Sequence, residues 1–148
     1  YIMLKQKAND KAETYVSGKE NSVGILQEGS TNNLRAMPIE IIGKEDVHGN
    51  NILDYHTKKN DLETVCSVRD PIIYKKISER AKIAFVLLKG RLFGRIDIKM
   101  DHKGIPYFIE ANIMPGLQKG YFYRSCSINL KMDYDTMITN ISENALTF

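Results

Sequence analysis

Apolar and polar side chains alternate in two neighbouring parts of the chain, residues 92–100 and 105–113. A period of two is typical of strands with one buried face, and Asp101-His102-Lys103-Gly104 between them contains turn-forming residues. The pattern therefore predicts a β-hairpin. Residues 14–42 predict further strands, because short β-rich runs there are separated by turn residues such as Ser17-Gly18.

Apolar residues recur every three or four positions across residues 71–90, which predicts an amphipathic helix of about five turns. Pro71 suits the first turn of such a helix, and Gly90 is a plausible stop. Between the strands and this helix, residues 43–70 are polar and lack a sustained period. We expect them to form a long excursion, a kind of segment that often carries function.

A second helical stripe runs through residues 134–145, with Asp133 or Asp135 as its cap. The length of 148 residues fits one domain, and 43% hydrophobic with 26% charged residues excludes a mainly disordered or collagen-like chain. The net charge of +3 is small and its charges are mixed along the chain, so it offers no strong footprint for nucleic acid. The chain begins with Tyr1 and not with Met, which suggests a fragment.

Cysteine usage and hydropathy indicate a cytoplasmic protein. Cys66 and Cys126 are too few for a disulfide framework, and no His/Cys cluster has the spacing of a zinc site. The longest apolar runs fall far short of the roughly 20 residues that cross a bilayer, and no signal peptide is recognisable. We therefore expect no contact with a membrane.

The predicted hairpin gathers charged side chains on one face. A four-residue loop would place Glu110 opposite Arg95, whereas a two-residue Lys103-Gly104 loop would place it opposite Asp97. Both registers put these three residues and Asn112 on the same face. The other face is apolar and should pack against the helix that starts near Pro71, burying Ile96, Ile98, Met100, Ile109, Ala111 and Ile113.

Two carboxylates and an amide oxygen form an oxygen-rich site that suits Mg²⁺ better than zinc. An arginine beside them could complement an oxyanion or a phosphate with its planar fork of donors. The alternative is an ordinary solvated face, on which an arginine opposite an acid is a cross-strand ion pair. Spacing alone favours the solvated face.

The residues at the ends of the hairpin change this balance. Gly94-Arg95-Ile96-Asp97, together with residues 110–116, which end in Pro115-Gly116, resembles the magnesium- and nucleotide-binding end of the ATP-grasp superfamily, in its D-alanine–D-alanine ligase branch. The same family is suggested by residues 13–20, 23–26, 38–41, 54–58 and 63–64. The resemblance implies an α+β fold, with an antiparallel sheet and packed helices, in which residues 1–148 form the C-terminal portion of an ATP-grasp ligase domain.

The resemblance also implies a role for each matching residue. Asp97, Glu110 and Asn112 would hold Mg²⁺, or Mn²⁺ in its place, against the phosphates of ATP, and Arg95 would stabilise the oxyanion of a tetrahedral intermediate. Lys58 would lie on a loop that closes over the γ-phosphate. The adenosine would be held by residues near the N-terminus: Glu13, Tyr15 and Val16 for adenine, and Glu20 for the ribose. Alternatively, Glu13 and Glu20 are surface strand charges and Lys58 is a solvated lysine.

The implied reaction joins a carboxylate to an amine through an acyl phosphate. It needs no covalent enzyme nucleophile, so we expect Cys66 and Cys126 to be packing residues. The implied partners are small amino-acid-like substrates and the upstream part of the same ligase. That part usually supplies two phosphate-binding lysines and a glycine-rich loop. A homodimer is compatible with this interpretation, and without the upstream lobe the chain is expected to be inactive.

Two departures from the family pattern affect the substrate. Tyr121 stands where the D-alanine ligases typically have a serine that helps to hold the amino acid, and Lys59 replaces a common tyrosine. Together with Tyr123 and Arg124, Tyr121 could shape a different substrate pocket, or the aromatic residues could simply pack at a helix start. The rival hypothesis for the whole chain is an ATP-binding or regulatory module without catalysis.

Overall fold

The computed structural model describes residues 2–6, 9–13, 16–29, 33–45, 51–52 and 63–146. The strands in chain order are β1 (Ile2–Gln6), β2 (Asn9–Glu13), β3 (Gly18–Glu28), β4 (Asn33–Ile42), β5 (Lys44–Glu45), β6 (Asn51–Ile52), β7 (Thr64–Ser67), β8 (Phe93–Asp101) and β9 (Pro106–Asn112). The helices are α2 (Pro71–Leu87), α3 (Tyr121–Leu130) and α4 (Tyr134–Leu146).

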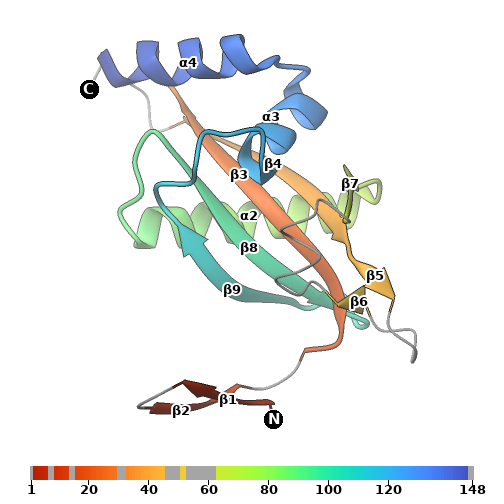
Figure 1. The fold of residues 1–148 in the computed structure, drawn as a ribbon. Helices are drawn as coiled ribbons and strands as arrows, with labels where there is room; N and C mark the ends of the chain where they lie inside the picture. Colours follow the sequence, from red (N-terminus) through yellow and green to blue (C-terminus); the bar gives the residue numbers. More distant parts are fainter. Residues whose placement is uncertain are drawn as a thin grey trace.

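Five strands form one antiparallel sheet in the order β7-β4-β3-β8-β9, and helices pack on it (Figure 1). This arrangement confirms the expected α+β fold. The predicted strands in residues 14–42 correspond to β3 and β4, which pair with each other at the centre of the sheet. Two small antiparallel pairs, β1 with β2 and β5 with β6, lie outside this sheet and were not predicted.

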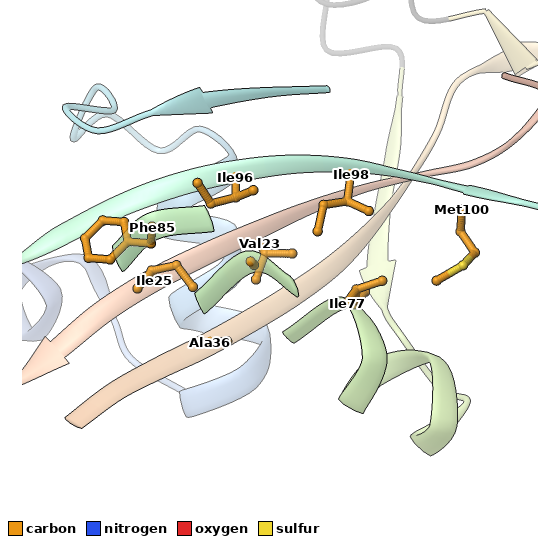
Figure 2. Packing of buried hydrophobic residues seen from close by; sticks show 9 residues of the cluster. Val23, Ile25, Ala36, Ile77, Phe85, Ile96, Ile98 and Met100 are labelled. Carbon is orange, nitrogen blue, oxygen red and sulfur yellow. The ribbon is translucent and has the colours of Figure 1, made fainter. Parts of the chain in front are cut away.

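Helix α2 covers one face of the sheet and closes the larger of two hydrophobic clusters (Figure 2). Burial alternates strictly along β8, as the sequence pattern predicts. The helix begins where expected, because the Asp70 side chain caps it by accepting hydrogen bonds from the amides of Ile72 and Ile73. The cluster contains Val23, Ile25, Ala36, Ile77, Ala81, Phe85, Ile96, Ile98 and Met100.

The predicted burial of β9 is wrong in part. Ile109 is 50% exposed and Ile113 is 49% exposed, whereas Ala111 does pack against the α2 cluster. Two structural features explain the difference: β9 is the last strand of the sheet, and its pairing with β8 shifts between Asp97 and Ile98. Such a shift breaks the simple alternation from which the burial was predicted.

The other face of the sheet is covered at one end by α3 and α4. Leu26 and Met37 of the sheet pack there with side chains from these helices, which include Phe122 and Met137. Gly24 allows the close approach of α3, because a Cβ at this position would lie 2.9 Å from the Cβ of Ser125. The rest of this face carries polar side chains such as Ser22 and Asp97, next to the buried Ile39 and Ile41 of β4.

The helix ends differ in detail from the predictions. Helix α2 ends at Leu87, before Gly90, and Lys89 takes the left-handed conformation with φ of 56°. Helix α4 was predicted, and Asp133 caps it by accepting from the amide of Thr136. For α3 only a helix start near Tyr121 and Tyr123 was considered, and its extent to Leu130 was not predicted. Residues 43–70 contain β7, which pairs with β4.

Candidate magnesium and phosphate site

Arg95 and Asp97 are two residues apart on β8, so their side chains lie on the same face, and they form a bidentate ion pair. The Arg95 Nε donates to Asp97 Oδ1 at 3.1 Å, and its Nη2 donates to Asp97 Oδ2 at 2.9 Å. The same Nη2 donates to Glu110 Oε1 at 3.2 Å. Glu110 faces Asp97 across the strands, which is the register predicted for a two-residue loop. One nitrogen atom therefore contacts both carboxylates.

Exposure differs sharply among these three side chains. Asp97 and Arg95 are 17% and 20% exposed, whereas Glu110 is 62% exposed. The Arg95–Glu110 contact is therefore the more easily exchanged of the two ion pairs, because solvent screens it. Arg95 Nη2 therefore contacts one largely buried and one exposed carboxylate.

Ser22 is part of the site and was not predicted as such. Its buried hydroxyl donates to Asp97 Oδ1 at 2.7 Å from the neighbouring strand β3, where it is the direct partner of Asp97. The signal was present in the run Ser22-Val23-Gly24-Ile25, because alternation places Ser22 and Gly24 on the face opposite the core. Pairing of β3 with β8 could not be read from the sequence.

Asn112 lies opposite Arg95 and thus at the same end of the hairpin. Its Oδ1 accepts a hydrogen bond from the amide of Met114 at 3.2 Å, in the turn that leaves β9. The side chain is therefore hydrogen-bonded to the backbone of the turn two residues further along. Its role as a metal ligand stays a prediction.

The residues present fit a magnesium ion. Asp97 and Glu110 are close enough for the Arg95 guanidinium to bridge them, so a cation can be shared by the two carboxylates. Among the described residues, there is no group of three or more His, Cys, Asp or Glu side chains that could hold a metal ion by themselves. Two carboxylates with an amide oxygen suit Mg²⁺, which keeps several water or phosphate ligands.

Tyr121 contacts both Arg95 on β8 and Glu63, the residue that precedes β7 at the opposite edge of the sheet. Its ring lies 5.7 Å from the Arg95 Cζ, within range of a cation–π contact, and its hydroxyl donates to Glu63 Oε1 at 3.1 Å. Arg124 Nη1 lies 3.9 Å from the same oxygen atom. Burial, followed by the charge of Glu63, raises the pKa of Tyr121 well above its usual value, so the hydroxyl keeps its proton.

The predicted nucleotide-binding residues are only partly described. Glu20 lies on β3 opposite Lys99 of β8, and its charge also acts on Tyr121. Val16 is half-buried just before β3. Glu13 is the last residue of β2, with only its backbone described, and Tyr15 and Lys58 lie outside the described residues.

Neither cysteine belongs to the site. Cys126 is buried on α3, and burial raises the pKa of its thiol to about 12. Cys66 lies on β7 and is half-buried.

Among the helices that the structure describes, no helix is both long enough and apolar enough to cross a membrane.

Comparison with known proteins finds relatives that are D-alanine–D-alanine ligases. A family model described as "D-ala D-ala ligase C-terminus" matches residues 5–143. The D-alanine–D-alanine ligase of Dechloromonas aromatica is 33% identical over 137 residues, which are 90% of this chain and 42% of that protein. The ligase of Dichelobacter nodosus is 26% identical over 144 residues, 95% of this chain and 44% of that protein.

Solved structures agree in fold. The D-alanine–D-alanine ligase of Bacillus anthracis complexed with ATP superposes with a TM-score of 0.68 at 18% identity, over 90% of this chain and 40% of that one. The VanG D-Ala:D-Ser ligase of Enterococcus faecalis gives 0.61 at 20% identity, over 87% and 36%. The chain spans less than half the length of these relatives. By the extent of the family match, it belongs to the family of D-alanine–D-alanine ligase C-terminal domains, within the ATP-grasp superfamily.

Proposed function

We propose that the chain is the C-terminal part of a cytoplasmic, ATP-dependent carboxylate–amine ligase of the D-alanine–D-alanine ligase type. Residues 1–148 would form one side of the ATP cleft, and an upstream part of the same polypeptide would form the other. The observation that carries the proposal is the contact of Arg95 Nη2 with both Asp97 and Glu110, because it unites an oxyanion-binding fork with a metal-binding pair.

Different residues of the site would act in the two steps of the reaction, phosphoryl transfer and attack by the amine. In the first half, the γ-phosphoryl group of ATP passes to a carboxylate oxygen, giving an acyl phosphate and ADP. Asp97, Glu110 and Asn112 would hold Mg²⁺, which when bound neutralises charge on phosphate oxygens. Glu20 would accept hydrogen bonds from the ribose. Glu13, Tyr15 and Val16 would line the adenine, and Lys58 would approach the γ-phosphate.

In the second half, the amine nitrogen attacks the carbonyl carbon, phosphate leaves with its bridging oxygen, and the nitrogen loses a proton. Negative charge develops on the carbonyl oxygen before the phosphate leaves. Arg95 would donate to this oxygen after giving up its exposed contact with Glu110. Ser22 and the fixed Asp97 would keep the orientation of the guanidinium during this exchange.

A phosphate-release assay on the complete gene product, with ATP, Mg²⁺ and a panel of amino acids, tests the proposal. Arg95→Lys keeps the charge and loses the planar fork, so kcat should fall about a hundredfold or more while ATP binding changes little. Glu20→Gln should raise the KM for ATP with little change in kcat. Absence of turnover with every amino acid, alongside intact ATP binding, would instead favour a nucleotide-binding module.

A further inference from the structure

Tyr121 forms a wall of the proposed site directly beside Arg95. It is the first residue of α3, and its ring lies against the Arg95 guanidinium while its hydroxyl points to Glu63, the residue before β7. The side chain thus lies over the face of the sheet that carries Asp97, between β8 and the residue that precedes the opposite edge strand β7. A group that reacts at Arg95 would meet this ring.

Glu63 is an unusual partner for the tyrosine, because its side chain is only 3% exposed. One oxygen, Oε1, accepts the Tyr121 hydrogen bond and lies 3.9 Å from Arg124 Nη1. The other oxygen, Oε2, is buried and has no hydrogen-bond partner in the described structure. A buried carboxylate with one oxygen unsatisfied is costly for folding, so its retention needs a reason.

The electrostatics of the pair determine what can bind beside it. Tyr121 keeps its proton and directs it at Glu63, so its hydroxyl is already committed as a donor. Glu63 accepts this one hydrogen bond and forms an ion pair with Arg124, and its charge lies in a region of low dielectric, where its field is poorly screened. Arg124 offsets that charge in part, through a contact near the limit for an ion pair.

We infer that the Tyr121–Glu63 pair selects the amine substrate, favouring one with a neutral or cationic donor group at this wall over one with a free carboxylate. The inference rests on the proposed ligase function and specifies the substrate class of the same site. A carboxylate there would meet an aromatic ring and the field of a buried like charge, whereas a neutral amide would not be repelled and an ammonium group would be attracted. The serine typical of the family would impose no such restriction.

The test gives an amino acid and its primary amide, for example alanine and alaninamide, at equal concentrations in one ATP-dependent reaction. The free amino acid supplies the carboxylate that is phosphorylated, and mass spectrometry compares the yields of dipeptide and dipeptide amide, which report the ratio of kcat/KM for the two amines. The complete gene product should use the amide with a kcat/KM about tenfold or more above that of the acid. Glu63→Gln keeps the shape and removes the charge, so the ratio should fall toward one. Glu79→Gln, an exposed substitution on α2, is the matched control and should leave the ratio unchanged.

Tyr121→Ser provides a second, independent variant, since it opens the wall and should raise kcat/KM for the free acid. Thermal unfolding of each variant identifies loss of the fold. Turnover with equal use of acid and amide, unaffected by Glu63→Gln and Tyr121→Ser, would overturn the inference and leave the ligase function intact. No phosphate release with any compound would reject the ligase function itself, and the inference with it.

Discussion

Asp97 shows how a single side chain can be oriented before any ligand arrives. Its two oxygens accept three hydrogen bonds, one from Ser22 and two from Arg95. The sequence predicted that Arg95, Asp97 and Glu110 share a face, because alternation along a hairpin is local information. It did not predict the contact of Ser22, which depends on the pairing of β3 with β8. It also did not predict the burial of Glu63, which was singled out only by the family resemblance and which precedes β7, the partner of β4.

The two cysteines should differ in reactivity. Cys126 is buried with a pKa of about 12, so at pH 8 its thiol stays protonated and inaccessible, whereas Cys66 is partly exposed. We expect iodoacetamide to label Cys66 in the native protein and to label Cys126 only after denaturation. Mass spectrometry of the digested protein reads both sites, and native labelling of Cys126 before Cys66 would contradict the packing.

Asp101 should make the hairpin turn sensitive to acid. Its Oδ1 accepts from the amides of Ile105 and Lys103 at 2.8 and 2.9 Å, and the bond from Ile105 is the main reason why its pKa is lowered. The ionised form therefore stabilises the fold above the unfolded-state pKa of about 3.9 and ceases to do so as pH falls through the lower folded-state pKa.

Urea unfolding of the wild type and Asp101→Asn at several pH values checks this. The wild type should be the more stable protein at pH 6, and the difference should shrink as the pH falls through the folded-state pKa of Asp101. A difference that stays constant down to the lowest pH would show that the carboxylate charge is not what stabilises the turn.

At the scale of the element, the hairpin adopts neither predicted register along its whole length. Near the site Asp97 faces Glu110, as a two-residue loop would give, but toward the turn Ile98 faces Phe108. The shift leaves Ile109 as the extra residue on β9. A bulge of this kind depends on the strain and packing of the assembled edge, which a pattern of alternation does not contain.

Helix α3 depends on tertiary packing, and its own sequence contains little that indicates a helix. Its sequence, Tyr-Phe-Tyr-Arg-Ser-Cys-Ser-Ile-Asn-Leu, is rich in residues of modest helix propensity, so local preference did not predict it. Burial of Phe122 and Cys126 against the sheet, together with the room left by Gly24, stabilises the helix instead. By contrast, α2 was predicted because its cap and its apolar stripe are both local features.

The hairpin strands should therefore tolerate substitution unequally. Ile98 of β8 is 2% exposed in the α2 cluster, so Ile98→Ala should lower the free energy of unfolding by about 2–5 kcal/mol. Ile109→Ala, the matched change on the exposed edge strand, should alter it by less than about 0.5 kcal/mol. Chemical denaturation measures both, and equal losses would mean that Ile109 is buried in solution.

For the whole molecule, the two faces of the sheet serve different purposes. Helix α2 covers one face with an apolar cluster, while the other face is shared between α3, α4 and the polar site. The sequence predicted the α+β class and the side of the hairpin that carries the charges. The strand order was not predictable, since it depends on contacts between β3, β4 and β8 far apart in the chain.

Magnesium should stabilise the folded chain if it binds the paired carboxylates. At ten times its Kd, a ligand that binds only the folded state adds about 1.4 kcal/mol. For a chain of this size, that corresponds to a rise in Tm of about 3–6 °C. Glu110→Gln should reduce the rise, because Glu110 is one of the two carboxylates that contact Arg95 Nη2. Glu79→Gln should retain it in the same calorimetric scan.

The position of β9 at the margin of the sheet has a consequence for handling the protein. In the part of the chain that the structure describes, β9 pairs with β8 alone, so its outer backbone groups remain available to another strand. Phe108, Ile109 and Ile113 add exposed apolar side chains along the same margin. Open edges of this composition promote strand-to-strand association between molecules. The colloidal stability of residues 1–148 in concentrated solution therefore depends on this strand being covered.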